Sequence, residues 1–369
     1  MTAPMAAPAP AESAAPGSRH VLVARLDSLG DVLVTGPAVR AVAARQDVGR
    51  VTFLCGSRGV AGAVLLPGVT ETLVWDSPWT GEAAPEVDPG DVSRFCRAIA
   101  DLRVDEAVIF TSFHQTPLPL ALLLRVAGVP RISAASVDGP GTLLDNRIRP
   151  GEDFPEDQPE VLRALRIAGA AGFHLSDGDD GRMRVAIPPG RSPVAGSGPY
   201  VVVHPGADAP SRAWPVERHR RLVSLLASRG YRVLVTGGPG ERSLTAQVAG
   251  TSGTDLGGRT CLSDLARILA GAEVVVVGNT GPAHLAAAVG TPVVSLFSPV
   301  VPAIRWQPYG VPLELLGDQD APCGDTRARE CPVPGHPCLE SVTPTQVLAA
   351  VARFSGPPVR RPFVARRAE

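Results

Sequence analysis

The stretch that decides the fold is VVVVGNTGPAHL, which occupies residues 274–285. Its four consecutive valines have the length and the β-branched composition of a buried strand. A turn of small residues follows, and the helical pattern after it ends at Gly290, a residue type favoured just beyond a helix. A buried strand that runs through a short turn into a helix is the building unit of doubly wound α/β proteins.

The same alternation of strands and helices runs along most of the chain and predicts parallel sheets. In the first half, we expect helical segments between strands at 20–25, 50–54, 72–75, 106–110 and 131–134. In the second half, we expect them between strands at 200–204, 232–236, 273–277 and 292–297.

The length of 369 residues exceeds the size of one typical core and suits two domains. Residues 139–199 lack a clear alternation and contain clusters of Gly and Pro, so we interpret them as the interdomain linker. The predicted parts are a disordered leader, two Rossmann-like domains, a helix that packs back on the first domain, and a basic flexible tail. In chain order they occupy 1–18, 19–190, 191–342, 343–356 and 357–369.

The composition excludes several classes of function. The formal net charge is −1 and no dense basic block lies in the folded region, so a nucleic-acid partner has little electrostatic support. All 35 cationic residues are Arg, which excludes Schiff-base chemistry on a lysine and the lysine of a P-loop. A phosphate group would have to be held by Arg, by backbone N–H groups or by helix N-termini.

The chain carries no sign of export or membrane insertion. The Ala/Pro-rich leader has neither the charged start nor the continuous apolar run of a signal peptide. The longest apolar run, 118–129, is short for a membrane span and contains Arg125. We therefore expect a cytoplasmic protein without a transmembrane segment, in which the six cysteines are thiols.

The turn from Asn279 to His284 is the first candidate site. Thr280 can cap the helix that follows, and the free N–H groups of the first helical turn then point at whatever lies above the strand ends. Such a helix start suits an anion and, in particular, a diphosphate, to which His284 could donate a hydrogen bond. Taken alone, an ordinary strand-to-helix turn with a satisfied histidine explains these residues equally well.

Two more loops follow strands of the second half. In the loop 204–215, Arg212 is placed to reach a phosphate, although a surface arginine is the simpler explanation, and Trp214 is expected to pack under the loop. In the loop 236–241, Glu241 begins a helix and can bind a ribose hydroxyl or simply favour the helix dipole. Ligands of open α/β sheets bind at the carboxyl ends of the strands. Three such loops are therefore stronger evidence for a binding site than any one of them.

The first half offers a candidate general base. Asp31 begins the first helix after a glycine and could accept a proton there, and Asp27 competes for the same role. Neighbouring Ser28 and the loop residue His114 are weaker candidates for residues that line the same part of the site. An acidic residue that only stabilises a helix start is the common alternative for Asp31.

The cysteines near the C-terminus invite a comparison with zinc sites. Cys323, Cys331 and Cys338 lie near His336, but the spacing lacks a C-x-x-C pair. We interpret the segment as a structural loop with free thiols and expect no metal site.

Several motifs together resemble glycosyltransferase family 9, the ADP-heptose:lipopolysaccharide heptosyltransferases. The stretch 25–32, RLDSLGDV, resembles the family's opening strand and G-D-V turn, and 212–215, RAWP, resembles its basic-x-W-P motif. The stretch 279–284, NTGPAH, resembles its D-[ST]-G-x-x-H motif, and 290–297, GTPVVSLF, is also typical of it. The motifs occur in the family's order from about Val21 to Phe354.

The resemblance implies a GT-B fold, in which two Rossmann-like domains face a central crevice, and an inverting mechanism without metal or other cofactor. By position, Asp31 would deprotonate the acceptor hydroxyl in the first, acceptor-side domain. In the second, donor-binding domain, the diphosphate would lie at Thr280, Gly281 and His284. Arg212 would replace the family's phosphate-binding Lys, and Glu241 would match its ribose-binding acid. Asn279 replaces the motif's Asp, which removes a charge beside the donor.

The function predicted from the sequence is transfer of a sugar, most simply heptose from an ADP-linked donor. The acceptor would be a glycan, a lipopolysaccharide-core-like molecule or a small molecule. A nucleotide-sugar epimerase of the same fold and a non-catalytic nucleotide-sugar-binding relative remain alternatives. We expect a monomer and no nucleic-acid partner, and a peripheral membrane contact is compatible with a lipid-linked acceptor.

Overall fold

The computed structural model describes residues 18–81 and 84–356, and these residues form two compact units that divide between Ala186 and Ile187. All but the last residue of the predicted leader and the whole predicted tail lie outside the described residues. Among the described residues, no helix is both long and apolar enough to cross a membrane.

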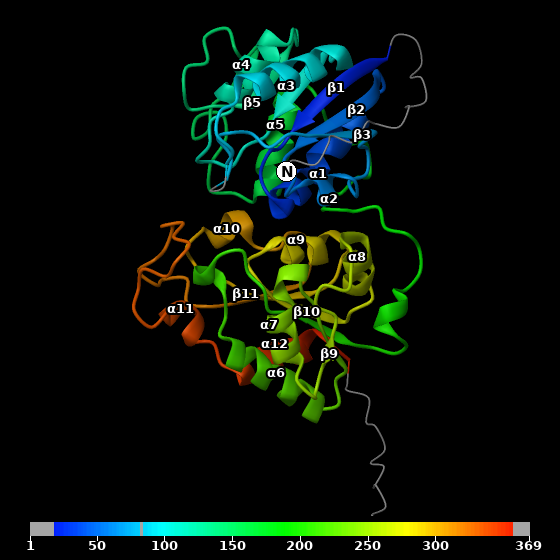
Figure 1. The fold of residues 1–369 in the computed structure, drawn as a ribbon, viewed down its shortest axis with the longest axis vertical. Coiled ribbons are helices and arrows are strands. Elements are labelled where there is room, and N and C mark those ends of the chain that lie inside the picture. Colours follow the sequence, from blue (N-terminus) through cyan, green and yellow to red (C-terminus); the bar gives the residue numbers. More distant parts are fainter. Residues whose placement is uncertain (1–17, 82–83, 357–369) are drawn as a thin grey trace, which may run out of the picture. The chain divides into compact units, whose positions relative to one another are not determined.

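The first unit is built on a parallel sheet with the strand order β3-β2-β1-β4-β5-β6 (Figure 1). Its strands are β1 Arg19–Ala24, β2 Val48–Cys55, β3 Glu71–Val74, β4 Glu106–Ile109, β5 Ile132–Ala135 and β6 Asn146–Ile148. Its helices are α1 Leu29–Ala43, α2 Val60–Ala63, α3 Pro89–Leu102, α4 Leu118–Val126 and α5 Glu160–Ala170.

Strand β1 lies in the middle of this sheet because it is apolar on both faces. Leu22 and Ala24 pack into a core with buried residues of α3 and α4, among them Ile99 and Leu124. The helices α1 and α5 pack against each other. A strand with no polar face must be covered on both sides, which is the arrangement that parallel strands require.

The second unit repeats this plan with the strand order β12-β11-β10-β7-β8-β9. Its strands are β7 Val201–His204, β8 Val233–Val235, β9 Thr254–Asp255, β10 Val274–Gly278, β11 Val293–Leu296 and β12 Leu313–Leu316. Its α-helices are α6 Val216–Ser228, α7 Arg242–Ala249, α8 Leu262–Ala270, α9 Gly281–Ala288, α10 Ala303–Trp306, α11 Pro337–Glu340 and α12 Pro344–Phe354, and short 3-10 turns are η1 Pro193–Ala195, η2 Pro210–Arg212 and η3 Pro239–Glu241.

Both sheets reverse their strand order between the first and the fourth strand of the unit. In the first unit the reversal lies between β1 and β4, which pair through Val21–Ala24 and Glu106–Ile109. In the second unit it lies between β7 and β10, which pair through Val201–His204 and Val274–Val277. Loops at such a reversal diverge and leave room for a ligand above the carboxyl ends of the strands. The α/β prediction of two doubly wound parallel sheets is confirmed.

The final helix corrects one prediction. The buried residues of α12, Val347, Leu348, Ala350 and Val351, belong to the core of the second unit, where α12 packs on α6, β10 and β11. The expectation that this helix packs back on the first domain is therefore wrong. Its apolar positions recur at helical spacing and are covered by the sheet of its own unit. The local sequence pattern predicts the apolar face of the helix but not the sheet on which that face packs.

The segment interpreted as a linker also contains structure. Residues 139–199 include β6, the edge strand of the first sheet, and α5, which packs on α1. The alternation of strand and helix is hard to recognise in this part of the sequence, because β6 has only three residues and because Gly and Pro lie on both sides of α5. The irregular segment after Pro299 likewise contains a sheet strand, β12.

Candidate functional site

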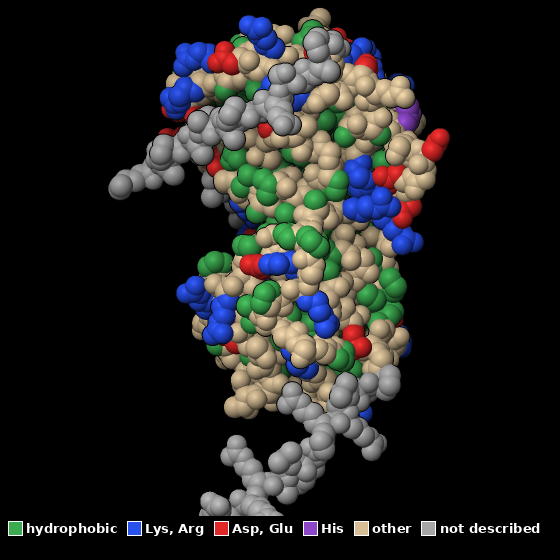
Figure 2. Space-filling model, turned by 90° about the vertical axis from the view of Figure 1, so that its right-hand side faces the viewer, with side chains coloured by type: hydrophobic (Ala, Val, Ile, Leu, Met, Phe, Trp, Pro, Cys, Tyr) green, Lys and Arg blue, Asp and Glu red, His purple; other side chains and the backbone are tan. Residues whose placement is uncertain are grey.

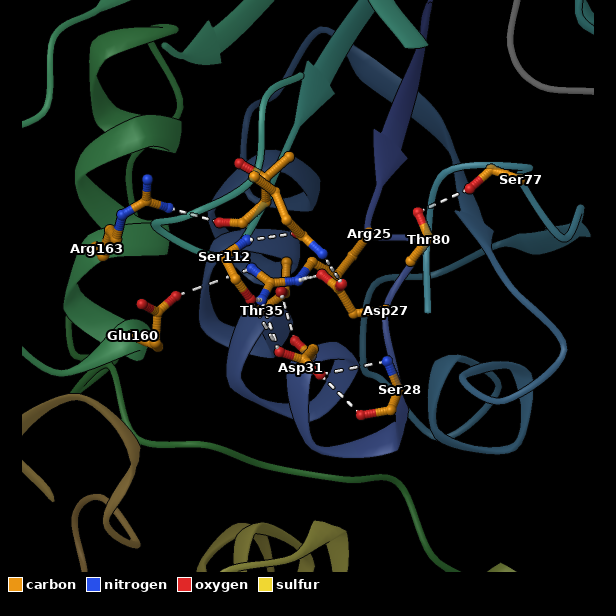
Figure 3. A network of polar contacts seen from close by, with 12 residues as sticks. Arg25, Asp27, Ser28, Asp31, Thr35, Ser77, Thr80, Ser112, Glu160 and Arg163 are labelled. Atoms are coloured by element: carbon orange, nitrogen blue, oxygen red, sulfur yellow. Dashed lines mark hydrogen bonds and ion pairs between the residues drawn. The ribbon is translucent and has the colours of Figure 1, made fainter. Parts of the chain in front are cut away.

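Arg25 is the centre of a polar network at the end of β1 in the first unit (Figure 3). Its side chain is 2% exposed, and it lies within ion-pair distance of three carboxylates. Its Nε lies 2.8 Å from Asp27 Oδ2, its Nη2 lies 2.8 Å from Asp31 Oδ1, and its Nη1 lies 3.9 Å from Glu160 Oε2. Burial alone would lower the pKa of Arg25, but the three carboxylates outweigh it and raise the pKa above its ordinary value.

Asp31 is held through both of its carboxylate oxygens. Oδ1 accepts a hydrogen bond from Arg25, and Oδ2 accepts from the Ser28 backbone N–H at 3.2 Å and from the Ser28 hydroxyl at 2.8 Å. Ser28 is the extended residue that precedes α1, so Asp31 does satisfy a helix start as one interpretation predicted. Its side chain is nevertheless 15% exposed, which leaves part of the carboxylate within reach of a ligand.

Asp27, the rival base, is also held at both of its oxygens. Its Oδ1 accepts a hydrogen bond of 2.6 Å from Gln115 Nε2, and its Oδ2 faces Arg25. Burial raises the pKa of Asp27 above its ordinary value and the nearby charge of Asp31 adds to the rise, whereas Arg25 opposes it. Asp27 therefore holds a proton more readily than an ordinary aspartate does, and its carboxyl group cannot act as a base while it is protonated.

Four residues of this network were missed by the sequence analysis. Arg25 begins the motif 25–32, and its charge at the end of an apolar strand is the one signal in the sequence that points to it. Ser112 accepts from Arg25 at 2.8 Å and Gln115 accepts from the Ser112 backbone N–H at 3.0 Å, and both follow β4. Glu160 comes from α5, in the segment interpreted as a linker. His114 is exposed, with its ring edge against Phe113, and its neighbour Gln115 is the residue that reaches Asp27.

The predicted phosphate turn of the second unit follows β10, at the reversal of that sheet. Asn279 is buried, and Thr280 is the extended residue that precedes α9. The backbone carbonyl of Arg212 passes close to this turn, since a Cβ added to Gly278 would lie 3.2 Å from it. The loops that carry Arg212 and Asn279 are thus neighbours. His284 is buried on α9, with its ring 6.5 Å from that of Trp306.

The Arg212 loop is anchored by the cysteine-rich segment. The Ser211 backbone N–H donates to the Arg329 carbonyl at 2.8 Å, and the Ser211 hydroxyl donates to the Ala328 carbonyl at 2.6 Å. Trp214 is buried and donates to the Val342 carbonyl at 3.2 Å, which confirms that it packs under the loop. These bonds fix the backbone on either side of Arg212.

Glu241 lies against the glycines of two neighbouring loops. Its Oε2 accepts from the Gly238 backbone N–H at 2.6 Å, so it stabilises the start of its own helical turn. A Cβ on Gly206 would lie 1.7 Å from Glu241 Oε1, and only glycine leaves room there. The buried ring of His204 lies 4.0 Å from Glu241, and burial lowers the pKa of His204 although Glu241 opposes this. With its side chain 32% exposed, Glu241 stays accessible at the mouth of both loops.

The three C-terminal cysteines are free thiols. Cys323 and Cys338 are buried, and Cys331 lies 3.3 Å from the Val333 carbonyl. Burial raises the pKa of Cys338 above its ordinary value, which makes this thiol unreactive. Within the part of the chain that the structure describes, no group of His, Cys, Asp and Glu side chains has the arrangement of a metal site.

Charged side chains of both signs are interspersed over the face seen in Figure 2, as the formal net charge of −1 suggests.

Comparison with known proteins gives the class. The profile described as Glycosyltransferase family 9 (heptosyltransferase) matches residues 155–336. Lipopolysaccharide heptosyltransferase 1 of Pseudomonas aeruginosa is 34% identical over 320 residues, which cover 85% of this chain and 87% of the relative. Lipopolysaccharide heptosyltransferase 3 of Escherichia coli is 32% identical over 116 residues, which cover 30% of this chain and 34% of the relative.

Two solved structures share the fold. A glycosyl transferase family 9 protein of Veillonella parvula has a TM-score of 0.72 at 15% identity, covering 92% of this chain and 98% of that protein. The ADP-heptose lps heptosyltransferase II of E. coli has a TM-score of 0.69 at 18% identity, covering 90% and 98%. The fold and these relatives define a glycosyltransferase with two Rossmann-like domains, the GT-B architecture. The chain belongs to glycosyltransferase family 9.

Proposed function

We propose that this enzyme transfers heptose from ADP-heptose to a hydroxyl group of a lipopolysaccharide-core-like acceptor, with inversion at the anomeric carbon and without a metal ion. The sugar and the class of acceptor follow the name of the P. aeruginosa relative, whose similarity extends over both units. The chemical step is assigned to Asp31 because its carboxylate is fixed at both oxygens and still partly exposed.

In the proposed reaction, the acceptor oxygen forms a bond to the anomeric carbon as the bond from that carbon to the diphosphate breaks. The acceptor proton passes to Asp31, and ADP leaves with the bonding electrons. We prefer Asp31 to Asp27 because burial raises the pKa of Asp27, which favours its protonated form, and a protonated carboxyl group cannot accept the acceptor's proton. A well-placed general base contributes roughly 10²- to 10⁴-fold to the rate.

The donor is assigned to the second unit. The backbone N–H groups at the start of α9 would receive the diphosphate, with Thr280, Gly281 and His284 around it and Asn279 behind them. Arg212, on the neighbouring loop, would offset the charge of the leaving diphosphate, which is how this lysine-free chain could dispense with a metal ion. Glu241 would accept hydrogen bonds from the ribose hydroxyls.

A nucleotide screen tests the donor assignment. We expect ADP to raise the melting temperature of the protein more than UDP, GDP and dTDP do, in buffer containing EDTA. Equal stabilisation by all four would contradict the adenine-linked donor, and a strict need for Mg²⁺ would contradict the metal-free mechanism.

A product analysis then tests the reaction. ADP-heptose with a heptose-free core oligosaccharide should yield ADP and a glycoside whose anomeric configuration, read by NMR, is opposite to that of the donor. A stereoisomer of the donor formed without any acceptor would instead indicate an epimerase. Tight donor binding with no product across an acceptor panel would indicate a binding protein.

A further inference from the structure

His204 is a buried titratable residue beside the proposed donor site, and the proposed reaction assigns it no role. It is the last residue of β7 and is 5% exposed. Strand β7 pairs with β10 on one side and with β8 on the other, so its carboxyl end lies at the reversal of strand order, where ligands of such sheets bind. A histidine buried at the end of an otherwise apolar strand needs polar partners, and these partners indicate what it does.

The first partner of His204 is Thr236, the residue that follows β8. Val203 and Val235 are opposite each other in the parallel pair of strands, so His204 and Thr236 lie side by side one position further along. Thr236 is fully buried, and its Oγ1 lies 3.1 Å from His204 Nδ1. A hydroxyl group can either donate to this nitrogen or accept from it, so the other ring nitrogen decides which tautomer is favoured.

The second partner of His204 is Glu241. His204 Nε2 lies 4.0 Å from Glu241 Oε2. A lone pair on Nε2 would be repelled by the carboxylate, whereas an N–H group there is attracted to it. The favoured arrangement therefore has the Thr236 hydroxyl donating to Nδ1 and the proton of the neutral ring on Nε2. Burial holds the pKa of His204 below its ordinary value, so the ring is neutral at pH 7.

The surroundings of the Glu241 carboxylate fix the direction in which it points. Its Oε2 accepts from the Gly238 backbone N–H at 2.6 Å and lies beside the His204 ring. A Cβ on Gly206 would lie 1.7 Å from Oε1, and a Cβ on Gly237 would lie 3.1 Å from Oε2. The carboxylate is thus bounded by the backbones of two loops and by one ring. The part of the side chain that stays exposed, 32%, is open to a ligand.

We propose that His204 is a positioning residue for the donor: oriented by Thr236, its Nε2–H group keeps the Glu241 carboxylate turned toward the ribose hydroxyls of the nucleotide. This rests on the proposed function, which assigns Glu241 to the ribose. Without the ring, the carboxylate loses the N–H group beside Oε2 and gains space into which it can turn. His204 thereby contributes to the selection of a ribonucleotide over a deoxyribonucleotide, and it acts through Glu241 rather than through a contact of its own with the sugar.

The experiment measures the preference for ribose apart from sugar transfer. Titration calorimetry on the full chain would compare the affinities for ADP, 2′-deoxy-ADP and 3′-deoxy-ADP. His204→Phe keeps a buried ring but removes both nitrogens, and His204→Gln restores an N–H group near the position of Nε2. The matched control is Tyr200→Phe, which removes a buried hydroxyl that donates to the Ile268 carbonyl at 2.7 Å, just before the other end of β7. Melting curves establish that each variant is folded.

We expect the wild type to bind ADP at least about tenfold more tightly than one of the two deoxy analogues, as for a hydrogen bond to a charged group. His204→Phe should lower the affinity for ADP about tenfold and leave the affinity for that analogue unchanged, and His204→Gln should recover most of the loss. Tyr200→Phe should lower the melting temperature and keep the wild-type preference. Thr236→Val removes only the hydroxyl that orients the ring and should lose part of the preference, which tests the proposal even where His204→Phe does not fold.

A double-variant cycle separates action through Glu241 from a general effect on the fold. In a Glu241→Gln background, His204→Phe should cause no further loss of ADP affinity, because the carboxylate that it positions is gone. Additive losses would overturn the proposal, as would an unchanged preference for ADP in His204→Phe or in Thr236→Val. Equal binding of ADP and both analogues by the wild type would refute the ribose role of Glu241 and this inference with it. A preference that depends on His204, found without any transfer of heptose, would refute the proposed reaction alone.

Discussion

Arg25 donates to Asp31 Oδ1 across 2.8 Å while its Nε lies 2.8 Å from Asp27. A planar guanidinium thus separates two carboxylates that compete for the role of base and gives each a different environment. The other oxygen of Asp31 accepts from the Ser28 N–H and hydroxyl, whereas the other oxygen of Asp27 accepts from Gln115. We therefore propose that Arg25 is a positioning residue that holds the two aspartates in different environments.

Replacing Arg25 by Lys tests this positioning role. An ammonium group keeps the positive charge but cannot bond to both carboxylates in the planar geometry of a guanidinium. We expect kcat to fall about 10- to 100-fold with the KM for the nucleotide sugar unchanged. The control is Arg40→Lys, because Arg40 forms a comparably tight pair with Asp179 at 2.7 Å elsewhere in the same unit. Arg40→Lys should lower the melting temperature without changing kcat, and equal losses of kcat in both variants would refute the specific role of Arg25.

Asp31→Asn tests the base itself. Asparagine has the same shape but keeps only one acceptor oxygen, so it can accept from Arg25 or from Ser28 but not from both, and it cannot take a proton. We expect transfer to fall by at least about 10³-fold, with ADP affinity in the thermal-shift assay unchanged. The exposed Asp101 on α3 provides the control Asp101→Asn, which should retain full activity. If Asp31→Asn retains wild-type turnover, the base is another group.

The contact between Gly206 and Glu241 leads to a prediction about the donor. In Gly206→Ala, the new methyl group would overlap Glu241 Oε1, so the carboxylate must leave its position. We expect the affinity for ADP, measured by titration calorimetry, to fall about tenfold or more. Gly240→Ala is the matched control, because a Cβ there has no heavy atom within 4 Å and belongs to the same 3-10 turn as Glu241. Unchanged ADP affinity in Gly206→Ala would remove Glu241 from the donor site.

The buried ring of His219 leads to a prediction of how the stability of the fold depends on pH. Its ring is buried beside Trp214, and burial, with a smaller contribution from His204, lowers its pKa to about 3. At a pH above 6.5, the pKa of this histidine in the unfolded chain, the ring is neutral in both the folded and the unfolded state. Its titration therefore does not change the free energy of unfolding in that range. As the pH falls below 6.5 the unfolded chain binds a proton that the folded chain does not, and stability is lost at about 1.4 kcal/mol per pH unit until the pH approaches 3.

The variant His219→Leu removes this titration. Urea unfolding at pH 7 and pH 5 should show that the wild type loses about 2 kcal/mol more than the variant between these two values. The exposed His174 supplies the control His174→Leu, which should follow the wild type. A parallel loss in wild type and His219→Leu would contradict the prediction.

The local parts of the site were open to prediction. The turn 279–284 and the start of α1 at Asp31 each lie within one strand–turn–helix unit, whose apolar strand, small-residue turn and helix pattern are all contiguous in the chain. By contrast, Ser112 and Gln115 meet Arg25 and Asp27 across separations of 87 and 88 residues. Nothing in the pattern of either segment specifies such a meeting, because it depends on β4 pairing beside β1.

The sequence by itself determined the fold class, the family and the order of the loops that end the strands, because hydrophobic periodicity and turn residues act over a few neighbouring positions. Only the tertiary structure decided that α5 supplies Glu160 to Arg25, that α12 packs on the second sheet, and that Arg25 contacts both Asp27 and Asp31. Those outcomes depend on contacts between buried charges and between apolar faces that lie far apart in the sequence. Such contacts form only when the whole unit packs.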